Sequence, residues 1–393
     1  MVPNIRLKGF EGDWEERSLG DVYTERNERG NDSLQILSVS IHDGVSDGEL
    51  DEEGLGKVVR RSEDKSTYKH VYEGDLVFNM MRAWQGAIGV VKTEGMISPA
   101  YISAIPNDDV YPPFMDYALR RKEAIAQINN LSYGVTDFRK RLYWDSFVKV
   151  RCFLPSVEEQ KRIAETFESL DRYISLTQRQ CDDLKELKKY MLQKMFPRDG
   201  KMVPEIRFAG FTDDWEQRKL GDVCQVTMGQ SPDGSTYSDT PSDYILVQGN
   251  ADLKDGWVSP RIWTTQKTKT AEAGDLIMSV RAPAGSMGKT SYNVVLGRGV
   301  AGIKGNEFIY QSLVKMDSDG YWKKLAAGST FESINSDVVN GAELMVPQDI
   351  DEQNKIGDYF ASIDALITLH QRKHDTLLEF KTYLLQNMFP RED

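Results

Sequence analysis

Residues 156–197 read SVEEQKRIAETFESLDRYISLTQRQCDDLKELKKYMLQKMFP, and the architecture of the chain is built around this segment. Its seam residues are spaced alternately four and three positions apart, which is typical of a long coiled-coil helix. Residues 349–390 repeat the pattern in the same register, 356 minus 163 or 193 positions further on. The predicted apolar seam positions are Ile163, Phe167, Leu170, Ile174, Leu184 and Met191 in the first copy, and Ile356, Phe360, Ile363, Ile367, Leu377 and Leu384 in the second.

Both copies carry start and stop signals. Each begins with a side-chain acceptor followed three residues later by a carboxylate, Ser156 with Glu159 and Asp349 with Glu352, which predicts a capped first turn. A proline at positions 197 and 390 ends each helix. About forty residues make a rod of roughly 60 Å. Because an amphipathic rod of that length needs a partner, we infer that the two copies pair with each other.

Polar residues interrupt both seams near their midpoints, at Thr177 and Cys181 in the first copy and at His370 and His374 in the second. A parallel and an antiparallel pair would both bring these positions together, so periodicity leaves the direction of pairing open. The two histidines have the spacing of zinc ligands, and Cys181 could approach them. We interpret the polar positions instead as residues that fix the register of the pair, and we expect no metal site.

Composition bounds the class of protein. The chain has 393 residues, of which 40% are hydrophobic and 28% charged, enough for two or more domains with cores of their own. No signal-peptide pattern and no run of eighteen apolar residues is present, and the three cysteines are odd in number and far apart, which predicts a cytoplasmic protein without a disulfide framework. The net charge, 49 minus 61 or -12, taken alone points away from nucleic acid.

The chain contains an internal duplication with a period near 200 residues. Residues 1–22 and 202–223, here called the leading segments, are identical at 15 of 22 positions, and residues 160–198 and 353–391 at 20 of 39. The order is therefore leading segment, variable region and long helix, given twice. We predict domains at 1–154 and 201–346, with helical regions at 155–200 and 347–393.

The two variable regions have diverged but share a Gly-Asp-Leu turn, at 74–76 and 274–276, followed by Arg82 and Arg281. Short apolar runs after each turn predict strands, and residues 114–128 predict a helix. We therefore expect the α+β class, with one mixed α/β fold carrying two different surfaces.

Basic charge is concentrated inside these regions. Residues 119–151 hold eight basic and three acidic side chains, and residues 256–304 seven and two. Aromatic residues such as Tyr133 and Trp144 lie among them. Basic and planar groups in loops are suited to phosphate contact and base reading, although most such residues in proteins are solvated surface or core. The predicted DNA-binding residues are Arg82, Trp84, Gln85, Arg139 and Lys140 in the first region, and Gln230, Lys267, Lys269, Arg281, Lys289 and Arg298 in the second.

Motifs that resemble catalytic or ion sites are incomplete. Residues 285–290, GSMGKT, have proline at position 283 where a phosphate-binding loop needs glycine, so we assign Lys289 to DNA contact instead. Residues 43–54 resemble a calcium loop but lack its final glutamate, which favours an acidic surface loop. No nucleophile, base and acid stand together in a recognisable pattern. We therefore expect no catalytic residue and no cofactor in this chain.

The sequence resembles the DNA-specificity subunit of type I restriction-modification systems over its full length. The resemblance rests on VPEIRFAGFTDDWEQRKLGDV, on helices that open with EEQKRI and DEQNKI and close on MFPR, and on MRAWQGAIG, SPAY, GQSP and SVRAP in the variable regions. It implies two target recognition domains separated by an antiparallel coiled coil of the two long helices, related by a pseudo-twofold axis. It also implies that each domain reads one part of an asymmetric bipartite site in double-stranded DNA.

The resemblance further implies partners that carry the chemistry. These are two methyltransferase (modification) subunits with S-adenosylmethionine, and restriction subunits that use ATP and Mg²⁺ to translocate and cut DNA. Helix length would then set the spacer between the half-sites. Two other classes stay open: an enzyme acting alone, and a coiled-coil scaffold with two protein-binding heads, which the acidic net charge favours.

Overall fold

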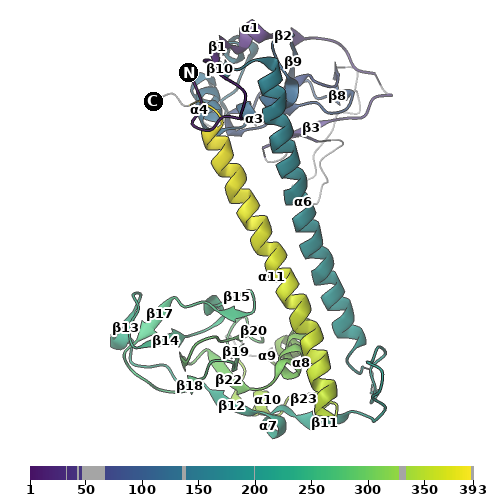
Figure 1. The fold of residues 1–393 in the computed structure, drawn as a ribbon, viewed down its shortest axis with the longest axis vertical. Coiled ribbons are helices and arrows are strands. Elements are labelled where there is room, and N and C mark those ends of the chain that lie inside the picture. The colour runs from purple at the N-terminus through teal and green to yellow at the C-terminus, as the bar shows by residue number, and fades with distance from the viewer. Residues whose placement is uncertain are drawn as a thin grey trace. The chain divides into compact units, whose positions relative to one another are not determined.

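The computed structural model describes residues 1–31, 33–41, 44–46, 67–134, 139–198, 200–326 and 333–390. The chain divides into two compact units: unit 1 comprises residues 1–176 and 374–393, and unit 2 residues 177–373 (Figure 1). Unit 1 therefore joins the two ends of the chain, whereas unit 2 is one continuous stretch. Apart from 44–46, the segment 43–54 predicted as an acidic loop lies outside the described residues.

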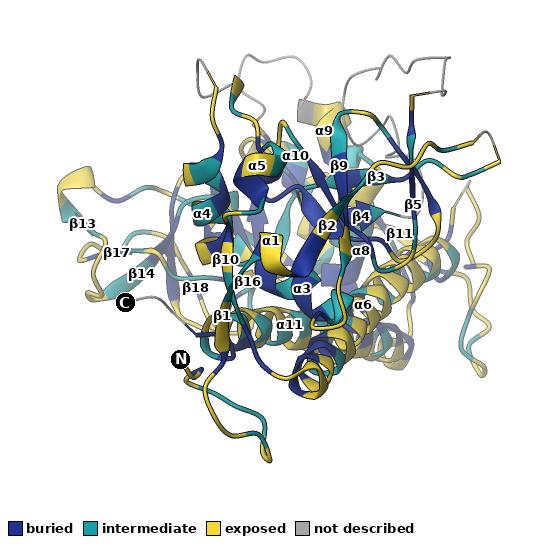
Figure 2. Cartoon of the chain, turned by 90° about the horizontal axis from the view of Figure 1, so that it is seen from above, coloured by how far each residue is buried: buried dark blue, intermediate teal, exposed yellow. Residues whose placement is uncertain are grey.

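Two long helices, α6 (Val157–Lys194) and α11 (Ile350–Asn387), have 38 residues each, as the sequence predicts. Their lengths are about 57 Å at 1.5 Å per residue. The amide of Glu159 donates to Ser156 Oγ (3.3 Å) and the amide of Asp351 to Asp349 Oδ1 (2.8 Å), so both predicted N-caps form. Figure 2 shows exposed residues, in yellow, along both helices.

The carboxylates of the predicted capping boxes have a different role. Glu159 accepts from Arg6 Nε and Nη2 (2.8 and 2.7 Å), and Glu352 accepts from Arg207 Nε and Nη2 (2.7 and 2.8 Å). Both glutamates are 1% exposed. Each long helix is therefore tied at its start to the leading segment of its own repeat, because an almost fully buried carboxylate requires a charged partner.

Within unit 1 the start of α6 and the end of α11 pack antiparallel. The rings of Phe167 and Phe389 lie 6.1 Å apart, and the side chains of Asp171 and Lys381 form an ion pair. Residue numbers thus rise along one helix as they fall along the other. The predicted seam residues Ile163, Phe167, Leu170 and Leu384 are buried in this core, and Ile174 and Leu377 pack partly buried against it.

Unit 2 contains the same arrangement between the end of α6 and the start of α11. Cys181 Sγ lies 3.5 Å from Gln371 Oε1, and Lys188 Nζ lies 2.7 Å from Asp364 Oδ1, which again gives an antiparallel direction. Ile356, Phe360 and Ile363 are buried, and Met191 and Ile367 pack partly buried against them. Leu184 is half-buried.

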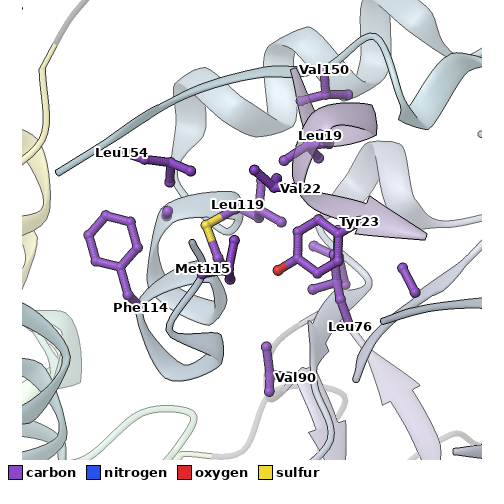
Figure 3. Packing of buried hydrophobic residues seen from close by; sticks show 14 of the residues in the cluster. Leu19, Val22, Tyr23, Leu76, Val90, Phe114, Met115, Leu119, Val150 and Leu154 are labelled. Atoms are coloured by element: carbon purple, nitrogen blue, oxygen red, sulfur yellow. The ribbon is translucent and has the colours of Figure 1, made fainter. Parts of the chain in front are cut away.

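The part of unit 1 outside the long helices, here called its head, is built on an antiparallel sheet. The strand order is β2 (Tyr23–Arg26), β9 (Tyr101–Pro106), β6 (Leu76–Asn79) and β7 (Ile88–Val90). Residues 114–128, predicted as one helix, form parts of α3 (Pro112–Leu119) and α4 (Lys122–Leu131), because Arg121 has extended backbone angles, φ -71° and ψ 153°. The core lies between this sheet, α3 and the short helix α1 (Leu19–Val22), and includes Leu76, Val90 and Phe114 (Figure 3). The remaining elements are β1 (Glu15–Ser18), β3 (Ser38–Ser40), β4 (Gly44–Ser46), β5 (Lys69–Val71), β8 (Gly95–Ile97), α5 (Trp144–Phe147) and β10 (Arg151–Leu154).

The head of unit 2 has two larger sheets. One has the order β12 (Gln225–Met228), β22 (Val300–Lys304), β19 (Leu276–Ser279), β20 (Met287–Lys289), β16 (Trp257–Val258) and β15 (Leu253–Lys254). The other has the order β13 (Tyr237–Ser238), β17 (Ile262–Thr264), β14 (Tyr244–Val247), β21 (Val294–Leu296) and β18 (Thr270–Ala271). The remaining elements are β11 (Glu216–Lys219), paired with β23 (Glu343–Val346), and the helices α7 (Leu220–Val223), α8 (Glu307–Ser318), α9 (Tyr321–Ala326) and α10 (Ser336–Asn340).

Equivalent hydrogen bonds attach the leading segments in both units. The amide of Ile5 donates to the carbonyl of Asn387 (2.8 Å) at the end of α11, and the amide of Ile206 to that of Lys194 (2.9 Å) at the end of α6. Each leading segment thus holds the start of one long helix and the end of the other. Among the described residues, no helix is apolar and long enough to cross a membrane.

Candidate nucleic-acid interface

In unit 1 the predicted residues Arg82, Trp84 and Gln85 lie on a tight turn that follows β6. The amide of Arg82 donates to the carbonyl of Asn79 (3.0 Å), and residues Ala83–Gln85 form one 3₁₀ turn. The turn ends at Gly86, whose φ of 105° favours glycine. Arg82 and Gln85 are exposed, while Trp84 is half-buried and donates from Nε1 to the carbonyl of Met81 (2.9 Å). The turn thus presents a cation and an amide on a fixed backbone.

A second loop lies beside this turn. The amide of Leu142 donates to the carbonyl of Met80 (2.9 Å), which brings the loop containing Arg139 and Lys140 to the end of β6. Arg139 is exposed, and Lys140 Nζ lies 3.4 Å from Asn129 Oδ1. The structure therefore brings the predicted residues of unit 1 onto two adjoining loops.

Unit 2 repeats this connection. The amide of Ile334 donates to the carbonyl of Val280 (2.9 Å), just as Leu142 does to Met80 in unit 1. Arg281 follows directly and is exposed, and its backbone pairs with Ser333. In both heads the arginine after the Gly-Asp-Leu strand thus lies next to a loop that is hydrogen-bonded to the end of that strand, two residues after Met80 in unit 1 and one residue after Val280 in unit 2.

Three predicted residues of unit 2 meet at one end of the six-stranded sheet. Strands β12 and β19 both pair antiparallel with β22, so the ends of β12 and β19 lie beside the start of β22. Gln230 follows β12, Arg281 follows β19 and Arg298 precedes β22. The Arg298 amide donates to Ser231 Oγ (3.1 Å), which joins two of these loops directly.

The two predicted lysines at 267 and 269 lie at the same place. Thr268, between them, donates from Oγ1 to the carbonyl of Gln230 (2.6 Å), and the amide of Leu296 donates to the carbonyl of Lys269 (2.7 Å). Both lysines are exposed. This end of the sheet therefore collects Gln230, two lysines and two arginines from four segments of the chain.

Lys289 lies elsewhere. It pairs with Leu276 at the start of β19, which is the opposite end of the sheet. Its Nζ forms an ion pair with Glu307 (2.9 Å) and lies 5.0 Å from the ring centre of Trp257 and 4.6 Å from that of Tyr310. The structure thus separates Lys289 from the other predicted residues of unit 2 and gives its charge an internal partner.

The basic residues on the two loops of unit 1 and at one end of the sheet in unit 2, here called the basic clusters, differ in ion pairing from basic residues closer to the cores of the heads. Arg26, for example, is bound by the buried carboxylate of Asp75, with Nε 2.6 Å from Oδ2. Among the described residues, by contrast, none of Arg82, Arg281 and Arg298 forms an ion pair. Exposed guanidinium groups without a carboxylate partner are available to phosphates and to the acceptor edges of bases.

Comparison with known proteins fits this geometry. Residues 212–379 match the family model described as type I restriction modification DNA specificity domain. Over 95% of its length the chain is 25% identical to the putative type I restriction enzyme MjaX specificity subunit of Methanocaldococcus jannaschii, 92% of which is matched. Residues 212–379 thus match this specificity domain, and the chain is similar to type I specificity subunits over nearly its full length. The MjaVIII specificity subunit of the same organism is 22% identical over 71% of this chain and 68% of its own length.

The fold of this chain is similar to those of solved proteins. The type I restriction-modification S subunit from M. genitalium superposes with a TM-score of 0.66 at 13% identity, with both chains covered completely. A chain from a structure of a type I R-M system, described for its complex assembly and conformational transition, gives a TM-score of 0.56 at 22% identity and covers 98% of this chain and 99% of its own. The α+β fold expected from the sequence is therefore confirmed.

No local sequence pattern indicates how each head is attached to the long helices. In unit 1 the Tyr117 hydroxyl on α3 donates to Asp171 Oδ2 (2.8 Å), and Asp171 pairs with Lys381. In unit 2 Gln311 Nε2 on α8 donates to Asp364 Oδ2 (2.9 Å), and Asp364 pairs with Lys188. The aspartates are equivalent in the repeat, since 171 plus 193 is 364, but the head residues differ in type. Comparison of the two repeats thus identifies the aspartates but not Tyr117 and Gln311, the head residues that bind them.

Other candidate sites in this chain have less support. Within the described ranges, no three histidine, cysteine, aspartate or glutamate side chains are placed to hold a metal ion. A cavity of about 460 Å³ in unit 2 is lined by residues that include Arg218, Cys224 and Lys304. It lies at the end of β22 remote from Arg298 and therefore does not belong to the basic cluster.

Proposed function

We propose that each head of this specificity subunit reads one part of an asymmetric bipartite site in double-stranded DNA. The proposal is supported mainly by the placement of Arg82 and Arg281 shortly after the matching strands β6 and β19, with different neighbours in the two heads. An arginine at either position can donate two hydrogen bonds to guanine, and Gln85 or Gln230 can pair with adenine. Since these neighbours differ, the two half-sites differ as well.

The exposed lysines supply the part of the affinity that does not depend on sequence. Lys267 and Lys269 flank the Gln230 loop, where phosphate contacts would set the orientation of the head on the duplex. Each neutralised phosphate releases counterions, so binding weakens as salt concentration rises. A net charge of -12 does not oppose this function, because the cations are gathered at the strand ends.

We further propose that the paired helices recruit two methyltransferase subunits. Each unit leaves apolar side chains exposed on the helix pair: Tyr173, Leu176, Phe380 and Tyr383 in unit 1, and Leu187, Tyr190, Leu366 and Leu369 in unit 2. These residues are 43–60% exposed, far more than the seam residues. Exposed apolar clusters of this kind are typical of protein–protein interfaces.

The position of the cluster follows from the heptad. Tyr173 directly precedes the seam residue Ile174, and Phe380 directly precedes Lys381, which occupies the seam position between Leu377 and Leu384. In an antiparallel pair, Tyr173 and Phe380 therefore lie on the same side of the two helices. The head binds the other side, through Asp171, which is two residues or about 200° of helix away from Tyr173. An apolar side of the helix pair thus stays open in unit 1.

The internal repeat predicts the number of partners. Tyr173, Leu176, Leu187 and Tyr190 become Leu366, Leu369, Phe380 and Tyr383 when 193 is added, so unit 2 has an equivalent apolar cluster. Two equivalent surfaces suit two copies of one partner. On this proposal the partners carry S-adenosylmethionine for adenine methylation, and restriction subunits use ATP and Mg²⁺.

Two measurements test the proposal. Mobility shifts of the chain with methyltransferase subunits should show sequence-selective DNA binding that weakens with salt. Binding without sequence preference, or none, would favour the protein-binding scaffold.

The docking surface is tested by Phe380→Asp and Leu187→Asp, each of which should weaken methyltransferase binding by about 30-fold. Val157→Asp is the matched control, because Val157 is 41% exposed on the same α6 but lies outside both clusters. Unchanged affinity of both variants would contradict this surface.

A further inference from the structure

Tyr133 is a half-exposed aromatic residue at the candidate interface of unit 1. Its side chain is 53% exposed, and its ring lies 5.0 Å from that of Tyr143 with a tilt of 33°. Its backbone exchanges two hydrogen bonds with Arg141, of 3.1 and 3.0 Å. The ring is therefore exposed to solvent but held in place by its neighbours.

The backbone of Arg139 approaches Gly134, the residue next to this ring, closely. A Cβ at Gly134 would lie 2.2 Å from the carbonyl oxygen of Arg139, so no larger residue fits there. This close approach holds Tyr133 beside Arg139 and Arg141, both of which are exposed. The hydrogen bond from Leu142 to Met80 then places the ring near the Arg82 turn.

The chemistry of the side chain is that of a neutral planar group. Desolvation and the nearby carboxylate of Asp145 raise the pKa of Tyr133, so its hydroxyl stays protonated at neutral pH. Tyr143 packs against the ring at a tilt of 33°, and 53% of the Tyr133 side chain stays accessible to a planar partner. Such a ring among cations has the character of a stacking platform for nucleic-acid bases.

A closed duplex offers no base face for stacking except at its ends. An aromatic side chain can stack only where a base step is opened or where a base has been moved out of the helix. On the proposed function, Tyr133 lies where unit 1 meets DNA, and the methyltransferase partner must remove its target base from the stack.

We propose that Tyr133 stacks on a base of the first half-site at a step that opens in the complex. This inference rests on the proposed reading of DNA by unit 1 and adds a residue that stabilises the opened duplex. Because every base has a π-face, the contact adds affinity without selecting a sequence. It differs in this respect from Arg82, whose contact is expected to select a base.

The experiment uses the full chain assembled with its methyltransferase subunits. Tyr133→Ala should weaken binding to a fully paired cognate duplex by about 5- to 100-fold, and Tyr133→Phe by less than about 3-fold. With a mismatch at the target adenine, which opens the step in advance, the loss for Tyr133→Ala should shrink to less than about one third of its value on paired DNA. The half-site in methylome data should stay the same.

Controls separate this inference from the proposed function. Tyr292→Ala is the matched control, since Tyr292 is 44% exposed and follows β20 in unit 2, away from the basic cluster. It should bind like the wild type, and thermal unfolding of both alanine variants checks the fold. If the wild-type chain does not bind DNA with sequence selectivity, the proposed reading of DNA by the two heads is contradicted. Selective wild-type binding with a Tyr133→Ala loss below twofold, or with equal losses on paired and mismatched DNA, overturns only the role of Tyr133.

Discussion

Replacing Arg6 by methionine removes the partner of a carboxylate that is almost fully buried. Glu159 is 1% exposed and receives two hydrogen bonds from Arg6, of 2.8 and 2.7 Å. Arg6 also donates to the carbonyl oxygens of Gly12 and Glu11, the latter at 3.0 Å. Breaking one side of a buried ion pair costs about 3–5 kcal/mol, because the remaining charge has lost its solvent and its partner. We therefore expect Arg6→Met to lower the free energy of unfolding of unit 1 by about that amount.

Urea unfolding of the full chain measures the effect. Since the chain has two compact units, Arg6→Met should shift the transition of unit 1, and Arg207→Met, which leaves Glu352 unpaired, that of unit 2. The matched control is the double variant Arg6→Met with Glu159→Met, which removes both charges and should recover most of the loss. A loss below about 1 kcal/mol, or a double variant no more stable than the single one, would show that Arg6 does not stabilise unit 1 by pairing with Glu159.

Three further predictions follow from the described contacts. Arg82→Ala should reduce the free energy of DNA binding by about 1–3 kcal/mol and relax the base preference at one position of the site, whereas Lys267→Ala should weaken binding to all DNA sequences equally. If both variants weakened binding to all sequences equally, Arg82 would not be a base-reading residue. Inserting seven residues at equivalent points of α6 and α11 should lengthen the spacer by about 3 base pairs without changing either half-site, as methylome sequencing would reveal. Desolvation raises the pKa of the half-buried Cys152 to about 12 and that of the buried Cys224 to about 11, and Cys181 is fully buried, so thiol reagents at pH 8 should label the three cysteines rapidly only after unfolding. Rapid labelling of Cys181 or Cys224 in the folded chain would contradict their burial.

The helices were predictable because their signals are local and repeated. Alternating spacings of four and three, an N-cap residue and a closing proline together define Val157–Lys194 and Ile350–Asn387 to within a few residues. Periodicity did not give the direction of pairing. The antiparallel direction depends on contacts such as Lys188 with Asp364, which are far apart in sequence.

The site was harder to predict, since exposed loop residues carry no periodic pattern. Arg82 was proposed because it follows the Gly-Asp-Leu turn, and Arg298 because it lies in a range with an excess of basic residues. The same range included Lys289, whose carboxylate partner Glu307 lies in α8, outside the basic residue range. The role of Glu159 was misjudged for a similar reason, because the capping pattern is local and its arginine lies 159 minus 6 or 153 residues away.

On the proposed function, two unlike heads read one DNA site together. Methylome sequencing of a host that expresses this chain with its methyltransferase subunits is the decisive experiment. We expect adenine methylation at an asymmetric site with two specified parts and an unspecified spacer, and exchange of residues 23–154 for those of a specificity subunit with another site should change one part alone. A single continuous palindrome, or a change in both parts after the exchange, would contradict the proposed function.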